Sequence, residues 1–340
     1  MKKLFNKALM FQNIHSIKLQ TISLGILFGI ISYFSINSNM KNFIYYAANL
    51  YEGISEFSTS TGLCILTMIF FITLIFIFMK GINKRESSAF FMAGPFTKRD
   101  IKKNEVLTLI FLVLYFSAIL LYVIVCLTYK HRIQVKYIPD YYKFIFISII
   151  RMLIVGILFS FYLSFMDLLF SNTIVSILAM VAFPIMLIAI VTILLEVILS
   201  DKILNYVIPF CYKYFTCMFI YFFGENSDLL HNTYFSFNKI FILCTIVSIM
   251  AIIILGVLTY IISDKIKINN INNIFNFRIV ETISIQFILF SIIMEILIAV
   301  IELKEYSISR IVNLVLITIS YLVSNILRKF VVKKIDSYVN

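Results

Sequence analysis

The sequence predicts an all-α integral membrane protein, a polytopic bundle of about eight transmembrane helices. Of the 340 residues, 61% are hydrophobic and 14% are charged, and the mean hydropathy is +1.00. Soluble domains carry about 25% charged residues, so this chain has too little polar surface to cover a soluble core. A soluble enzyme, a disordered chain and a secreted disulfide scaffold are therefore excluded.

The apolar residues are gathered in runs that can each cross a hydrocarbon core of about 30 Å at 1.5 Å per residue. These runs lack the alternating polarity of barrel strands, so we expect helices. A further stretch, 203–223, contains Pro209 and Lys213 and is expected to be re-entrant or interfacial. The expected spans form one transmembrane domain, 19–327, and lie at about 19–36, 62–79, 106–129, 144–166, 173–199, 238–262, 279–301 and 308–327.

The two ends of the chain are basic. Residues 1–18 are predicted to form an uncleaved interfacial helix, since lysines precede the first span and no small-x-small cleavage site follows it. Residues 328–340 form a basic tail. The segments on the side of the N-terminus hold 18 of the 29 Lys and Arg, which predicts a multi-pass plasma-membrane protein with both termini cytoplasmic. The same bias accounts for the net charge of +12 without invoking nucleic acid.

The longest cytoplasmic connection, 80–106, is also the most charged. Asn83 and Glu86 have the spacing of a capping box, and Gly94-Pro95 ends the helix that would follow. This pattern predicts a short helix over 84–94 that carries the apolar side chains Phe90, Phe91 and Met92. Two interpretations remain open: these side chains enter the inner leaflet, or they dock on a partner protein.

A second capping box follows, in which Thr97 and Asp100 open a helix that continues through Lys102, Lys103 and Glu105 into the third span. The run Glu86, an apolar stretch, and Pro95-Phe96-Thr97-Lys98-Arg99-Asp100-Ile101 resembles the loop between the second and third helices of type-2 ABC exporter permeases. The resemblance covers about residues 1–262 and includes the basic N-terminal helix and the segment 203–223.

The resemblance implies that the 84–94 helix is a coupling helix, seated in a groove of a separate ATP-hydrolysing subunit. It also implies two permease copies, or this chain with a related one. Spans seven and eight exceed the usual six of that family. The residues that would contact the ATPase are Lys84, Arg85, Glu86, Phe90, Phe91, Met92, Pro95, Thr97 and Arg99.

Four charged residues fall within or at the ends of predicted spans: Arg151, Glu196, Glu281 and Glu295. Such residues are costly in hydrocarbon and usually have a partner or a water path. Arg151 and Glu295 lie at matched depths of roughly 10 Å and 9 Å from the outer surface, at 1.5 Å per residue. We therefore expect an ion pair of Arg151 with Glu295 or Glu196, serving either helix register or substrate and proton handling.

Gly25 and Gly29 form a G-x-x-x-G motif in the first span, which predicts close packing on a neighbouring helix or a second copy. The nine glycines form no P-loop, so ATP hydrolysis is expected in another subunit. No catalytic motif, C-x-x-C pair or His cluster is present, and we expect no enzymatic activity, metal or cofactor. Two alternatives to a permease stay open: an accessory or immunity-type membrane protein without transport, and an integral-membrane transferase.

Overall fold

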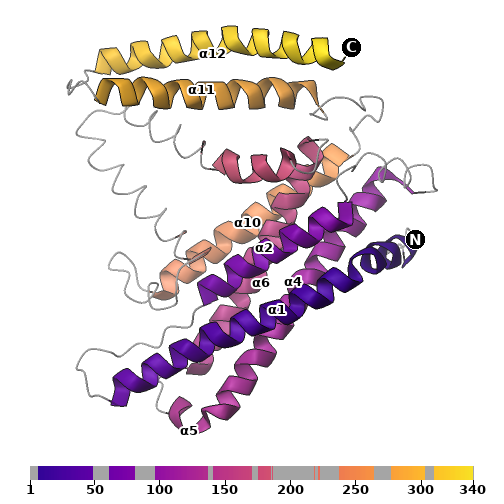
Figure 1. The fold of residues 1–340 in the computed structure, drawn as a ribbon, viewed down its shortest axis with the longest axis vertical. Helices are drawn as coiled ribbons and strands as arrows, with labels where there is room; N and C mark the ends of the chain where they lie inside the picture. Colours follow the sequence, from indigo (N-terminus) through magenta and orange to yellow (C-terminus); the bar gives the residue numbers. More distant parts are fainter. Residues whose placement is uncertain are drawn as a thin grey trace. The chain divides into compact units, whose positions relative to one another are not determined.

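The computed structural model describes residues 7–48, 61–80, 96–136, 141–170, 175–184, 237–263, 277–302 and 310–339, together with Met186, Met218, Tyr221 and Phe222. Within these ranges the secondary structure is helical, which confirms the all-α prediction for this part of the chain (Figure 1). The main helices are α1 (Lys7–Ala48), α2 (Thr61–Lys80), α4 (Lys98–Lys130), α5 (Arg132–Val135), α6 (Tyr141–Leu169), α10 (Phe237–Ser263), α11 (Arg278–Glu302) and α12 (Arg310–Val339).

Five of these helices are long and apolar enough to cross a membrane. They contain the predicted spans 19–36, 62–79, 106–129, 144–166 and 238–262, and their apolar parts are Leu9–Lys41, Gly62–Lys80, Lys98–Lys130, Tyr141–Leu169 and Phe241–Ser263. The protein is therefore a helical, membrane-embedded protein.

The other predicted spans are described less completely. Shorter apolar helices occupy Val175–Pro184 and, in α11, Val280–Ile293. Most of span 173–199 and most of the segment 203–223 lie outside the described residues. The total of eight crossings stays a prediction.

By internal packing the chain divides into two compact units. The first contains α1, α2, α4, α5, α10 and α6 up to Phe165. The second contains the end of α6, the helix Val175–Pro184, α11 and α12.

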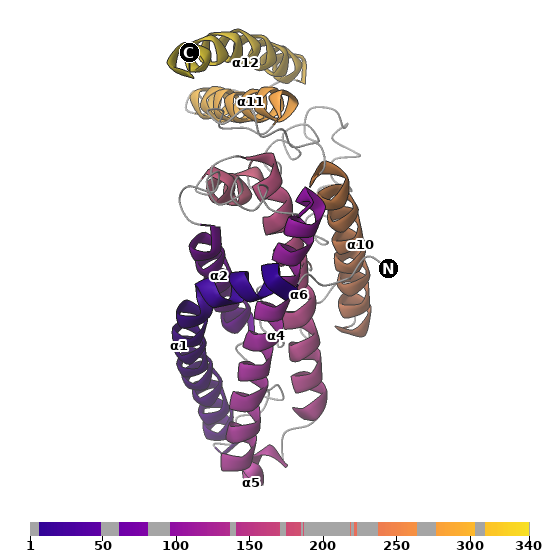
Figure 2. The ribbon, with the colours of Figure 1, turned by 90° about the vertical axis from the view of Figure 1, so that its right-hand side faces the viewer.

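In the first unit, α1 packs against α2 and α4 around an aromatic core. The ring of Phe28 from α1 lies 5.1 Å from that of Phe116 in α4 and 6.5 Å from that of Phe71 in α2. Helices α1 and α10 lie on opposite sides of α4 and α6 (Figure 2). Exposed apolar side chains are most evident on α10, where Ile246 and Ile253 are 55% and 59% exposed. Such side chains are unfavourable in water, and a surrounding hydrocarbon phase removes this cost.

The helices of this unit alternate in direction, as the predicted topology requires. At one end, Lys80 of α2 meets Glu105 near the start of α4, and Arg99 of α4 lies against Tyr260 near the end of α10. At the other end, Lys130 donates to Tyr33 of α1 over 3.1 Å. The end of α2, the start of α4 and the end of α10, which the sequence predicts on the cytoplasmic side, therefore lie at one end of this unit. Which membrane face this end occupies stays a prediction.

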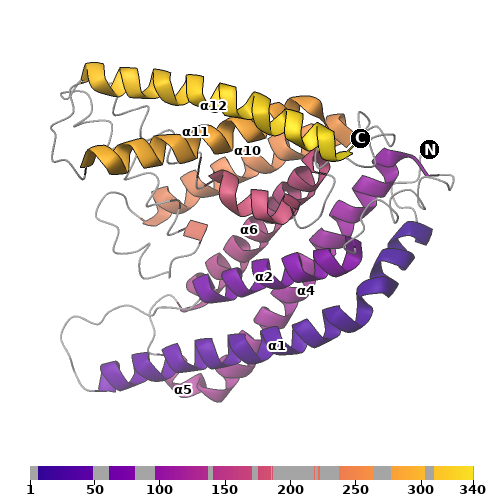
Figure 3. The ribbon, with the colours of Figure 1, turned by 45° about the horizontal axis from the view of Figure 1, so that its top comes forward.

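Two predicted boundaries fall inside continuous helices. Helix α1 runs for 42 residues across the boundary between residues 18 and 19, with a bend toward its N-terminal end (Figure 3). Helix α12 likewise continues to Val339 through the boundary at 328. No proline occurs in 1–48 or 310–340, so nothing in the local sequence stops either helix.

In the second unit, α11 and α12 lie side by side and run in opposite directions (Figure 1). The amide Nε2 of Gln286 in α11 donates to Ser324 Oγ in α12 over 2.7 Å. The ring of Phe183 stacks on Phe287, with centroids 5.3 Å apart and an interplanar angle of 7°. Buried serines on both helices, Ser284, Ser291, Ser320 and Ser324, allow the helices to approach closely.

Candidate functional site

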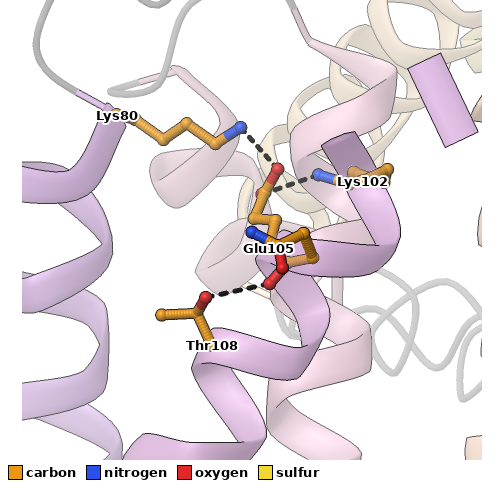
Figure 4. Close-up of polar contacts among 5 residues, drawn as sticks. Lys80, Lys102, Glu105 and Thr108 are labelled. Carbon is orange, nitrogen blue, oxygen red and sulfur yellow. Dashed lines mark hydrogen bonds and ion pairs between the residues drawn. The ribbon is translucent and has the colours of Figure 1, made fainter. Parts of the chain in front are cut away.

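A buried charged cluster joins the end of α2 to the start of α4, on either side of the loop predicted to couple to a partner. Figure 4 shows Glu105 between two lysines from these helices. Lys80 Nζ lies 2.5 Å from Glu105 Oε2, and Lys102 Nζ lies 2.8 Å from Glu105 Oε1. We call these three residues the Lys80–Glu105–Lys102 cluster.

Burial makes this cluster a structural constraint and not a loose surface pair. The side chains of Lys80, Lys102 and Glu105 are 13%, 7% and 3% exposed. Each carboxylate oxygen accepts from a different ammonium, so the charge of Glu105 compensates both desolvated lysines in part. Removing one partner of a buried pair typically costs 3–5 kcal/mol, about half of a small domain's stability.

Helix α4 begins with the capping box that the sequence predicts. Asp100 N donates to Thr97 Oγ1 over 3.2 Å, and Thr97 N donates to Asp100 Oδ2 over 3.3 Å. The Thr97 hydroxyl also donates to Asp100 Oδ2 over 2.6 Å. These bonds satisfy backbone donors of the first turn and set the residue at which the loop ends and the helix begins.

Arg99 connects this helix start to α10. Its guanidinium lies over the ring of Tyr260, with Cζ 4.4 Å from the ring centroid, which is cation–π geometry. Arg99, one of the residues that the resemblance assigns to partner contact, is therefore held by a contact within the chain. Three helices, α2, α4 and α10, are thus joined at the base of the loop.

The remaining coupling-loop residues, Lys84, Arg85, Glu86, Phe90, Phe91, Met92 and Pro95, lie outside the described residues, and so does Glu196. Their predicted roles, including the 84–94 helix, stay predictions.

Arg151 lies fully buried in α6, with 0% of its surface exposed. Its charge interacts electrostatically with Tyr221, and the Tyr221 hydroxyl lies 3.0 Å from Thr245 Oγ1 in α10. Only the helix position of Glu295 is described, so the predicted ion pair stays a prediction. Arg151 thus lies within electrostatic range of Tyr221 from the 203–223 segment, which its depth alone could not indicate.

Glu281 lies in the first turn of α11, and its backbone N–H donates to Phe277 O over 3.0 Å. A carboxylate at this position interacts favourably with the helix dipole. This placement at a helix start gives Glu281 a local structural role.

Gly25 and Gly29 lie on the side of α1 that faces α4 of the same chain. A Cβ atom added at Gly25 would overlap the side chain of Tyr115, and one at Gly29 would meet Ile119 Cγ2 at 3.4 Å. Glycine at position 25 thus allows α1 to approach α4 closely at the level of Tyr115, whereas position 29 has room for a Cβ atom.

The Lys80–Glu105–Lys102 cluster was not identified as a site from the sequence. The signal available was the i, i+3 spacing of Lys102 and Glu105 at the start of an apolar helix, where a charged pair is expected to be exposed. Among the described residues, no group of three or more His, Cys, Asp or Glu side chains could hold a metal ion.

Comparisons of the chain with protein-family models, with characterised proteins and with solved structures found no match. The functional interpretation therefore depends on the residues themselves and on the resemblance of the 86–101 run.

Proposed function

We propose that this chain is the transmembrane permease subunit of an ATP-driven exporter, and that a separate ATPase drives it through the 84–94 segment. The observation that carries the proposal is the fixed frame at the base of this segment. Lys80 and Glu105 join the helix that enters the loop to the helix that leaves it. In the sequence, the 86–101 run that resembles a coupling loop lies between these two residues.

A loop anchored in this way is suited to transmit force. Packed helices respond to a displacement as rigid bodies, not by continuous deformation. Because the cluster holds α2 and α4 together, a partner that moves the loop would move both helices. The stacking of Arg99 on Tyr260 would include α10 in the same movement.

The finer features of the proposal follow from the topology and the resemblance. The ATPase is a separate P-loop subunit, and two such subunits require two copies of this chain, or this chain with a related permease. The protein lies in the plasma membrane with both termini in the cytoplasm, where the loop can reach the ATPase. Phe90 and Phe91 would anchor in the partner's groove, and burial of each is worth about 1.5–3 kcal/mol.

The test is co-purification with a P-loop ATPase, sought first in the neighbouring reading frames. The double variant F90S/F91S should insert normally, because neither residue lies in a span, but should lose the ATPase and its stimulated ATP hydrolysis. Phe330→Ser is the matched control, since Phe330 is 67% exposed on α12 and lies outside the loop. That variant should keep both properties.

Normal assembly and hydrolysis in the double variant would contradict the coupling role and leave the loop as a membrane-surface anchor. Absence of a P-loop ATPase from the neighbouring frames, together with no co-purified ATPase, would favour an accessory membrane protein.

A further inference from the structure

A groove along α11 and α12 in the second unit has the composition of a lipid site. Its volume is about 310 Å³, and its wall includes Ile283, Phe287 and Phe290 from α11 and Tyr321 from α12. The polar side chains Thr282, Gln286 and Arg328 also line it. A ligand that fits must therefore present a long apolar part and a compact polar part.

The register of the two helices orders these side chains along the groove. The Gln286–Ser324 bond places these two residues at the same height along the helix pair. Because the helices are antiparallel, Thr282, four residues before Gln286, lies near the height of Arg328, four residues after Ser324. By the same register, Phe290 lies near the level of Tyr321. The groove is therefore polar at the Thr282–Arg328 end and aromatic at the other, over about 12 Å at 1.5 Å per residue.

Gln286 contributes a hydrogen-bond acceptor to the site. Gln286 Nε2 donates to Ser324 Oγ, and this hydroxyl donates in turn to Tyr321 O over 2.9 Å. The opposite atom, Gln286 Oε1, is buried and has no hydrogen-bond partner in the described part of the chain. Since hydrocarbon supplies no water to satisfy it, a bound molecule with an O–H or N–H donor would complete this site.

Arg328 lies one helical turn beyond Ser324, about 6 Å along the axis. Its Nη2 donates to Asn325 Oδ1 over 2.9 Å, which orients the guanidinium. The ion pairs found among the described residues all lie in the Lys80–Glu105–Lys102 cluster, and none involves Arg328. A guanidinium with further N–H groups available suits a phosphate, which it binds in bidentate geometry.

We propose that this groove binds a membrane phospholipid whose headgroup carries both a phosphate and a hydroxyl, as that of phosphatidylglycerol does. The phosphate pairs with Arg328, the hydroxyl donates to Gln286 Oε1, and an acyl chain lies along Phe287 and Phe290. The proposal requires the Arg328 end of α12 to lie at a membrane surface and is independent of any ATPase.

The test is native mass spectrometry of the purified full chain, titrated with phosphatidylglycerol or phosphatidylcholine. Phosphatidylcholine has the same phosphate but no donor, because its ammonium is quaternary. The unmodified protein should bind phosphatidylglycerol about tenfold more tightly, a difference of about 1.4 kcal/mol. Gln286→Leu should abolish this preference.

Arg328→Gln should weaken phosphatidylglycerol binding about tenfold, on the same scale. Lys329→Gln is the matched control, because Lys329 is exposed, neighbours Arg328 and does not line the groove. It removes the same charge and should change binding less than twofold.

Equal binding of the two lipids, or equal losses in the two charge variants, would overturn the proposal in favour of a general basic surface. A dimer without bound lipid would assign the groove to a second copy. If Arg328→Gln unfolds at a lower temperature than the unmodified protein, a second experiment replaces it. Phosphatidylglycerol with a photoreactive group at the end of its acyl chain is then crosslinked to the unmodified protein. Adducts within 283–290 support the site, and adducts elsewhere overturn it.

Discussion

The position of Glu105 depends on two helices, because its carboxylate accepts from Lys80 of α2 and from Lys102 of α4. We predict that Glu105→Gln destabilises the protein by about 3 kcal/mol, since it removes the carboxylate that two buried ammonium groups share. The measurement is thermal unfolding of the purified variant in detergent. The double variant E105Q/K102M, which removes one lysine as well, should be less destabilised than the single variant.

If Glu105→Gln melted at the same temperature as the unmodified protein, the cluster would contribute nothing to stability. Its role as the fixed base of the loop would then fail as well.

Residues set by local sequence could be predicted, and those set by tertiary contacts could not. The Thr97–Asp100 box is confirmed because its partners are three residues apart and need only a helix to meet. Lys80 and Glu105 are 25 residues apart, and their contact depends on how α2 packs on α4. The contact of Arg99 with Tyr260 is more remote still.

Small residues decide how closely the helices of the first unit pack. At Gly156 in α6, an added Cβ would lie 2.6 Å from Val113 in α4 and 2.9 Å from Met68 in α2. Val113 and Met68 are both fully buried and have no open space to move into. Gly156→Ala should therefore destabilise the protein by about 1–3 kcal/mol through overpacking, as measured by unfolding in detergent.

Gly29→Ala is the control, because it makes the same glycine-to-alanine change at a position with room for it. The atom nearest to the added Cβ would lie at an ordinary contact distance of 3.4 Å. Alanine also favours a helix over glycine by about 0.5–1 kcal/mol, so this variant should be neutral or slightly more stable. Equal losses at both positions would mean that helix contact distances do not explain the effect.

The elements themselves were largely predictable, since a run of about 20 apolar residues has few alternatives to a membrane helix. Their ends were less so. Residues 1–18 and 19–36 have different polarity, and the sequence therefore predicts two segments, yet one helix contains residues from both. The polarity of the side chains indicates whether a segment lies in water or in lipid. Whether the helix continues depends instead on the helix propensity of its residues, so the two properties need not change at the same position.

For the whole molecule, the alternating helices leave two orientations, and only the basic bias chooses between them. We predict that Lys98→Cys, in a chain without native cysteines, reacts with an impermeant maleimide only after cells are opened. Lys41→Cys, on an exposed residue near the other end of the bundle, should react on intact cells. The reverse pattern would place both termini outside and would remove the loop from reach of a cytoplasmic ATPase.

The sequence predicts the partner protein and the number of transmembrane crossings less strongly than it predicts the helices. A partner's surface is encoded in another chain, so the 86–101 run can only resemble a known contact. The last two spans carry polar residues such as Gln286 and Asn325, and these lower the hydropathy that distinguishes a crossing helix from a surface helix.

The length of α1 has a consequence for how the protein responds to different membranes. Its 42 residues extend about 63 Å, roughly twice the hydrocarbon thickness. A helix this long cannot be contained by tilting alone, so α1 must project into the headgroups and water on at least one side. Since Gly25 holds it against α4, thinning or thickening of the bilayer should shift the depth of both helices together and change which turns of α1 a soluble protease can reach.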